Sequence, residues 1–227
     1  MPCGEFELIA RNFSAFGRGP GVTLGVGDDA AILSVPDGCE LVTSVDTLVA
    51  GVHFPQDAFP EDIGYRCVAV AASDLAAMGA RPLAMTLALT VPEADDFWLH
   101  AFSEGIGQAS TAFRLPLVGG DTTRGACVIS VQVFGVVERG TALLRVGAHP
   151  GDGVFVSGYV GDAAAGLALL QSRWQSGPTH GEYLLSRYYR PTPRLALGEQ
   201  LAGIASAAID VSDGLLQDLG HIAAASG

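Results

Sequence analysis

The alternation of strand-like and helix-like apolar segments between residues 24 and 138 constrains the fold of this chain most strongly. The hydrophobic pattern predicts strands at 24–26, 31–35, 41–45, 82–91 and 127–137. It predicts helices at 5–16, 61–79 and 92–113, the last with Phe97, Ala101 and Ile106 toward the core. This order predicts an α+β fold in which a mixed sheet carries helices on one face. The other sheet face would be open unless a second subunit covers it.

The chain has 227 residues, enough for one large domain or two modest ones. Turn-forming residues are frequent between 140 and 152, which predicts a linker between an N-terminal domain, 1–139, and a second domain, 153–227. The second domain is expected to contain strands at 154–157 and 207–211 and to end in a helix that continues to about residue 225. No further strand follows, so we expect an incomplete α/β domain and a truncated protein.

The charge composition excludes several classes of function. The formal net charge is −12, which argues against a nucleic-acid partner held through phosphate contacts. All 12 basic residues are arginine. The absence of lysine excludes a phosphate-loop Lys, a protein-kinase strand Lys and a Schiff-base Lys. If the protein uses ATP, metal ions and arginines must neutralise the phosphates.

Other sequence features bear on the cellular environment. The cysteines are scattered without metal-binding spacing, at Cys3, Cys39, Cys67 and Cys127. Reduced thiols are expected, as in the cytoplasm. The N-terminus carries Glu5 and Glu7 and no signal-peptide pattern, and no segment reaches membrane length. We therefore expect a cytoplasmic protein without a membrane partner.

The segment from Pro116 to Gly125 carries the densest group of chemically useful residues. An apolar run leads into two glycines, and Asp121, two threonines and Arg124 follow. Glycine allows close approach of the backbone to a ligand, Asp is a hard oxygen ligand suited to Mg²⁺, and Thr and Arg suit phosphate. A tight hairpin turn with polar decoration is the alternative interpretation.

The same pattern of acids next to apolar segments recurs along the chain, at Asp28-Asp29, Asp46, Asp74, Asp210 and Asp213. The first pair could equally be an ordinary acidic turn. Asp74 lies in the middle of a helical segment that is apolar around most of its circumference, so its carboxylate needs a partner, either a metal ion or a distant arginine. Asp210 and Asp213 bracket a strand-to-helix corner whose helix N-terminus suits a metal-phosphate site. His53 could be structural or exposed, and the sequence gives no preference between a surface role and a phosphate contact for Arg145.

Taken together and in the same order along the chain, these acidic motifs resemble thiamine-monophosphate kinase. The motifs that carry the resemblance are residues 1–6, 25–29, 45–54, 73–80, 119–125 and 209–215. Single motifs also resemble the wider superfamily of aminoimidazole-ribonucleotide synthetase, selenophosphate synthetase and the hydrogenase-maturation dehydratase. The run Asp-Thr-Leu-Val-Ala-Gly-Val-His-Phe from Asp46 to Phe54 favours the thiamine-phosphate enzyme.

The resemblance implies a transferase of thiamine diphosphate biosynthesis that phosphorylates thiamine monophosphate with ATP. It also implies a homodimer in which the N-terminal sheets pair into a β-barrel. Matching positions imply Mg²⁺ ligands at Asp29, Ser44, Val45, Asp46, Asp74, Asp121, Asp210 and Asp213. They imply ATP contacts at Gly120, Asp121, Arg145 and Ser212, a thiamine-phosphate contact at His53, and catalytic roles for Asp121 and Asp213. Val45 replaces the family's usual Thr, so a metal could be bound there only by the backbone carbonyl.

Phosphoryl transfer to an anionic phosphate needs positioning and charge neutralisation more than a general base. We therefore expect direct in-line transfer on a carboxylate cluster holding several Mg²⁺ ions, without a phosphoenzyme. Two alternatives stay open: a related ATP-dependent synthetase or dehydratase of the same superfamily, and a truncated, non-catalytic Mg-ATP-binding protein.

Overall fold

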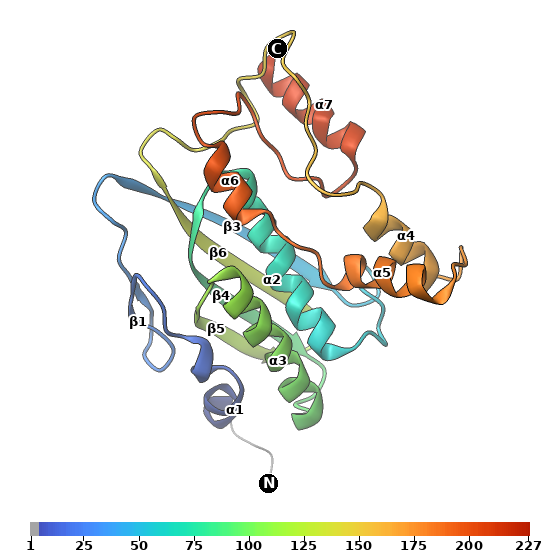
Figure 1. Ribbon diagram of the computed structural model, residues 1–227. Helices are drawn as coiled ribbons and strands as arrows, with labels where there is room; N and C mark the ends of the chain where they lie inside the picture. Colours follow the sequence, from blue (N-terminus) through green and yellow to red (C-terminus); the bar gives the residue numbers. More distant parts are fainter. Residues whose placement is uncertain (1–4) are drawn as a thin grey trace.

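A four-stranded mixed sheet forms the centre of the molecule (Figure 1). The computed structural model describes residues 5–227. The strand order is β3-β6-β4-β5, with β3 at Cys39–Val49, β4 at Arg81–Val91, β5 at Leu117–Arg124 and β6 at Val128–Glu138. Strand β6 pairs antiparallel with both β3 and β4, whereas β4 and β5 are parallel. The predicted mixed sheet is confirmed.

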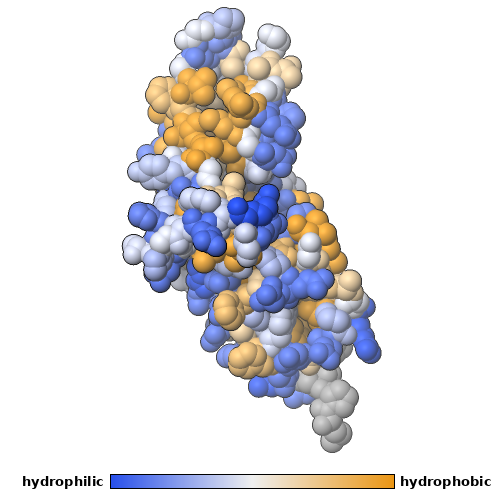
Figure 2. All heavy atoms as spheres, turned by 90° about the vertical axis from the view of Figure 1, so that its right-hand side faces the viewer, coloured by the Kyte–Doolittle hydropathy of each residue, from blue (hydrophilic) through white to orange (hydrophobic). Residues whose placement is uncertain are grey.

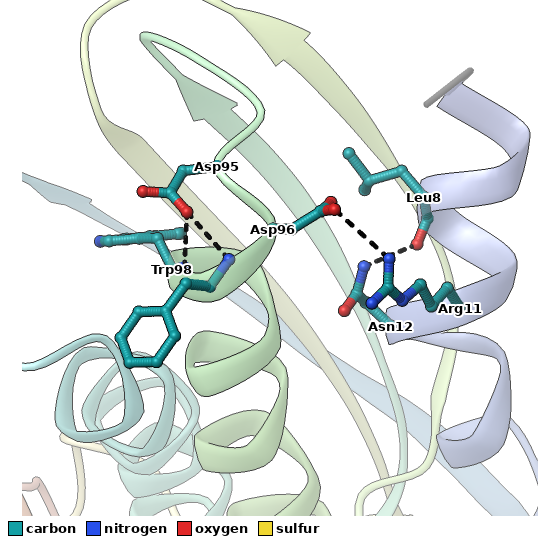
Figure 3. Close-up of polar contacts among 7 residues, drawn as sticks. Leu8, Arg11, Asn12, Asp95, Asp96 and Trp98 are labelled. Carbon is teal, nitrogen blue, oxygen red and sulfur yellow. Dashed lines mark hydrogen bonds and ion pairs between the residues drawn. The ribbon is translucent and has the colours of Figure 1, made fainter. Parts of the chain in front are cut away.

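Two long helices, α2 (Pro60–Ala77) and α3 (Asp96–Phe113), cover one face of this sheet (Figure 1). Proline at the first position and two acids in the first turn favour the start of α2. The Asp95 carboxylate caps α3 by accepting the backbone N–H of Phe97 at 2.8 Å and of Trp98 at 3.3 Å (Figure 3). The helices cross closely because Gly105 has no side chain: a Cβ there would lie 2.0 Å from the Glu61 carbonyl oxygen.

The N-terminal segment packs beside α3 and contains α1 (Glu5–Asn12), the 3₁₀ turn Ser14–Phe16, β1 (Val22–Leu24) and β2 (Ile32–Leu33). The predicted helix to residue 16 is therefore too long, because α1 ends at Asn12 and a 3₁₀ turn follows. An exposed ion pair of 3.4 Å joins Arg11 on α1 to Asp96 at the start of α3 (Figure 3).

The helix-covered face of the sheet forms the main core. Side chains alternate between faces, and the buried set on this face includes Leu87 and Leu89 of β4 with Val131 and Val133 of β6. On α3, Ile106 is buried as predicted, but Phe97 is 81% exposed because it lies in the capped first turn, beyond the sheet. The β1–β2 hairpin packs against one end of the opposite face through Leu33 and Val22.

The C-terminal part contains four helices, α4 (Asp162–Leu170), α5 (Pro178–Tyr189), α6 (Leu195–Leu201) and α7 (Leu215–Ser226). Helices α5 and α6 pack on α2, and α4 packs on α5. The strands predicted at 154–157 and 207–211 do not form. A strand requires a hydrogen-bonded neighbour, and within residues 5–227 no ladder partner pairs with either segment. The division into domains, with boundaries at 139 and 153 and an incomplete second domain, remains a prediction.

Two further expectations concern cysteines and membranes. Cys39, Cys67 and Cys127 are free thiols, and Cys3 lies outside the described residues. Within residues 5–227, no helix has the length and apolar character needed to cross a membrane.

Candidate functional site

A cavity of about 560 Å³ lies where the N-terminal sheet and helix α2 meet the C-terminal segment. Its polar lining comes from distant parts of the sequence: Ser44 on β3, Asp74 on α2, Arg145 in the segment after β6, and Asp210 before α7. Apolar side chains such as Val42, Met78 and Ile209 form the rest of the wall. The structure thus brings together four of the predicted site residues.

Asp74 has a direct partner on the neighbouring strand. The Ser44 hydroxyl donates a hydrogen bond of 2.5 Å to the Asp74 carboxylate, which is half-buried. This bond accounts for a carboxylate in the largely buried helix α2, because a hydrogen-bonded acid loses less solvation energy on burial. The partner is a neutral hydroxyl and adds no positive charge, so the carboxylate can still bind a cation.

Two further carboxylates face Asp74 closely enough to affect each other. Burial raises the pKa of Asp46, the charges of Asp74 and Asp210 raise it further, and nearby His53 lowers it. Burial and the charge of Asp74 likewise raise the pKa of Asp210, which a hydrogen bond from Ser73 partly offsets. The Asp74 carboxylate therefore disfavours the ionisation of both Asp46 and Asp210, and acids grouped in this way form a region that attracts a cation.

The imidazole of His53 lies in the tight loop that follows β3. Its Nδ1 accepts the backbone N–H of Val49 at 3.0 Å, so the free nitrogen is Nε2. The side chain is exposed, and its charge lowers the pKa of Asp46. This arrangement leaves the imidazole free to contact a ligand that enters beside the three acids.

Asp121 lies elsewhere. Residues 119–124 do not form a hairpin turn, because they belong to strand β5, which pairs in parallel with β4 and not with β6. Gly120 is required here by the neighbouring backbone, since a Cβ would lie 1.9 Å from the Leu87 carbonyl oxygen. The hairpin alternative for this segment was therefore wrong.

The strand register shows how far Asp121 is from the other acids. One row across the sheet joins Asp121 to Ala88, Ser130 and Thr47, and the adjacent row joins Asp46 to the buried Val131. Asp121 therefore points to the face opposite Asp46 and lies three strand spacings, roughly 14 Å, from β3. Val45, 61% exposed, shares the Asp121 face. Within one chain, neither side chain reaches the cavity.

Asp29 is exposed in the loop between β1 and β2, where its backbone N–H donates to the Asp28 carboxylate at 2.8 Å. Asp213 is exposed before α7 and accepts a hydrogen bond of 3.3 Å from Gln217. Neither residue is among those that line the cavity. Their predicted roles as metal ligands remain untested predictions.

The buried acid Asp218 was missed by sequence reasoning. It is 3% exposed, and its Oδ2 accepts the backbone N–H groups of Ser212, Asp213 and Gly214 at 3.0, 3.2 and 3.1 Å. Asp218 therefore occupies the helix N-terminus that had been expected to bind phosphate. The available signal was an acid in the first turn of α7, which favours free N–H groups just before the helix.

The oxygen-rich set around the cavity fits Mg²⁺ chemically. Mg²⁺ prefers carboxylate oxygens and usually needs only one or two of them, completed by water and phosphate. Among residues 5–227, no three His, Cys, Asp or Glu side chains converge into a ready-made metal site. The chain therefore offers individual carboxylates around a cavity, with room for phosphate oxygens between them.

Comparison with known proteins places these features in context. Residues 27–137 match the family of AIR synthase related protein, N-terminal domain. The thiamine-monophosphate kinase of Salmonella typhimurium is 52% identical over 229 residues, covering 100% of this chain and 70% of the relative. The crystal structure of thiamine-monophosphate kinase from Stenotrophomonas maltophilia K279a has a TM-score of 0.89 at 47% identity, covering 100% of this chain and 73% of that one. The structure of AaThiL complexed with AMPPCP and TMP has a TM-score of 0.79 at 33% identity, covering 99% and 71%.

Proposed function

We propose, since this chain belongs to the thiamine-monophosphate kinase family, that it transfers the γ-phosphoryl group of ATP to thiamine monophosphate and forms thiamine diphosphate. The observation that carries this proposal is the cavity, which brings together Ser44, Asp74, Arg145 and Asp210 from four regions of the chain. The relative AaThiL binds AMPPCP, an ATP analogue, together with TMP. Both ligands of that relative match the proposed substrates.

Asp46, Asp74 and Asp210, with the Ser44 hydroxyl, would hold Mg²⁺ on the cavity side of the sheet. When bound there, Mg²⁺ would neutralise charge between two polyanionic substrates. Arg145 lines the same cavity, and its guanidinium suits a phosphate of ATP, a role for which this sequence has no lysine. His53 would contact the phosphate of thiamine monophosphate.

The acceptor phosphate is already anionic, so the chain needs to orient it and exclude water rather than deprotonate it. We propose direct in-line transfer without a phosphoenzyme. Acid-quench experiments with γ-labelled ATP should give label in thiamine diphosphate and none on the protein. Label that enters and leaves the protein at the rate of turnover would contradict direct transfer.

We further propose a homodimer formed through the open face of the N-terminal sheet. This face exposes Leu41 and Val45 beside the row that ends at Asp121. A second copy on this face would cover these apolar side chains. It would also explain how Asp121 serves a site that it cannot reach in its own chain, because it would act in the partner's cavity.

Mixing two inactive variants tests this arrangement. Asp121→Asn and Asp74→Asn should each remove most activity with little change in melting temperature, whereas exposed Asp37→Asn should remain active. If each site combines Asp74 of one copy with Asp121 of the other, refolded mixtures should regain about a quarter of wild-type activity, because half of the dimers are mixed and each has one intact site. No recovery would show that both acids act within one chain.

The function itself is tested by measuring thiamine diphosphate formation from thiamine monophosphate and ATP, with Mg²⁺ and after its removal by chelation. We expect Mg²⁺-dependent product, and loss of product in Asp74→Asn. Mg-ATP binding without any product would instead favour a non-catalytic nucleotide-binding protein. ATP hydrolysis that does not respond to thiamine monophosphate would favour another member of the superfamily.

A further inference from the structure

A tyrosine of the C-terminal part forms a hydrogen bond to the backbone of the loop that carries His53. The Tyr188 hydroxyl, on α5, donates a hydrogen bond of 3.1 Å to the backbone carbonyl of His53. The two residues are 135 positions apart in the sequence. Among residues 5–227, this hydroxyl is the one protein donor found for that carbonyl.

Tyr188 is itself rigidly placed. The residue is 4% exposed, and the Arg66 guanidinium of α2 lies 4.2 Å from its ring centroid. Arg66 also donates to the Tyr188 backbone carbonyl. Burial raises the pKa of Tyr188, so its hydroxyl stays protonated and able to donate. Arg66 thus contacts both the ring and the backbone of Tyr188. The tyrosine therefore has little freedom to move its hydroxyl away from the His53 carbonyl.

The remaining contacts of the loop set the direction of the imidazole. His53 Nδ1 accepts from Val49 N–H, and the His53 backbone N–H donates to the Val49 carbonyl at 2.9 Å. Gly51 N–H donates to the Phe54 carbonyl at 2.8 Å. These bonds close the loop on itself. Phe54 anchors the end of the loop in the core, and the Tyr188 hydroxyl adds a hydrogen bond from α5 to the residue before it. The charge of His53 lowers the pKa of Asp46, so the loop holds the imidazole near the acids of the site.

From this chain of contacts we infer that Tyr188 is a positioning residue: its hydroxyl fixes the His53 loop, so that the imidazole is held ready for the phosphate of the acceptor substrate. This inference rests on the proposed function for the identity of that substrate. It links α5, in the C-terminal part, to the acceptor end of the site, while the ATP end, at Arg145, is not touched by Tyr188.

The adjacent tyrosine provides a matched control. Tyr188→Phe and Tyr189→Phe each remove one hydroxyl from neighbouring positions of α5, but only the first hydroxyl reaches His53. Tyr188→Phe keeps the ring over Arg66, so the fold should be retained. We expect its KM for thiamine monophosphate to rise about five- to tenfold, the range for loss of one hydrogen bond, with the KM for ATP unchanged. Tyr189→Phe should match wild type.

A double-mutant cycle separates positioning from a general structural role. If Tyr188 acts through the His53 side chain, Tyr188→Phe should add nothing to the KM of His53→Ala. Additive effects, or an equal rise in both substrate KM values, would overturn the inference.

Amide hydrogen exchange at residues 51–54 supplies a readout that does not need turnover. We expect exchange in this loop to be about five- to tenfold faster in Tyr188→Phe than in Tyr189→Phe. Equal exchange in the two variants would overturn the link between Tyr188 and the loop. A wild-type chain that makes no thiamine diphosphate would overturn the proposed function alone, and faster exchange in Tyr188→Phe would still support the link.

Discussion

The N-terminal sandwich and the C-terminal part of this chain are built in different ways. From Leu8 to Val137 buried apolar side chains form a continuous core between sheet and helices. After residue 150, the large apolar side chains that are buried are Leu184 and Tyr188, both on α5. Figure 2 shows apolar side chains gathered on the surface near α7, and exposed residues of this part include Val154, Phe155 and Leu216.

This difference indicates which contacts stabilise each part. The sandwich is stabilised by its own core, whereas α5 and α6 are ordered by packing on α2. The candidate site lies between the two, with Asp46 and Asp74 on the rigid side and Asp210 on the weakly packed side. Cation binding between these acids would therefore also tie the C-terminal part to the sandwich.

The largest expected effect compares one residue type in the two regions. Phe102 is fully buried and stacks on Trp98 at 5.0 Å, whereas Phe155 is 92% exposed. Phe102→Ala should lower the free energy of unfolding by about 3–5 kcal/mol, because it leaves a cavity in the core. Phe155→Ala should change it by less than about 0.5 kcal/mol. Urea denaturation measures both, and similar losses would show that the C-terminal part has a core of its own.

A smaller effect is expected at the loop before α7. Asp218→Asn should weaken three hydrogen bonds to backbone N–H groups and destabilise this region by about 1–3 kcal/mol. Amide exchange of residues 212–214 should accelerate while β4 and β6 stay protected. Exposed Asp213→Asn serves as the control. Acceleration across the whole sheet would show that the two regions unfold together.

The contact between α5 and the sandwich should be weaker still. Arg190 donates to Asp62 at 2.8 Å and to Gln108 at 2.7 Å. The side chains of the ion pair, Arg190 and Asp62, are both partly exposed. Arg190→Ala should destabilise the docking of α5 by about 1 kcal/mol, and Arg190→Lys should retain only part of the contact because it lacks the planar fork. Limited proteolysis should cut near α5 faster in the order Ala, Lys, wild type. Identical cleavage would show that apolar packing alone holds α5.

The smallest perturbation uses the native thiols as probes. Cys67 in α2 is fully buried, and burial strongly raises its pKa, whereas Cys39 and Cys127 are half-buried. A thiol reagent should modify the half-buried pair first and reach Cys67 only when the sandwich unfolds. Peptide mass spectrometry after timed labelling follows each site. Early labelling of Cys67 without loss of sheet protection would show that α2 opens separately.

Sequence patterns were reliable where burial is periodic and local. The expected strand at 82–91 matches β4 at Arg81–Val91, and the expected helix at 92–113 contains α3 at Asp96–Phe113. They failed at 154–157 and 207–211, where strand-forming composition is present but pairing is not. Asp218 was missed because its role depends on three backbone groups before the helix rather than on any neighbour in its own pattern.

The sequence by itself determined the fold class and the family and supplied the candidate acids, because apolar periodicity and motif order are properties of the chain. Only the tertiary structure decided which acids meet. Strand order places β3 and β5 at opposite edges of the sheet, and the pleat turns Asp46 and Asp121 to opposite faces. Asp74 and Asp210 join Asp46 because α2 and the segment before α7 pack beside β3. Neither strand order nor face is encoded in spacing along the chain, since both depend on which strands pair.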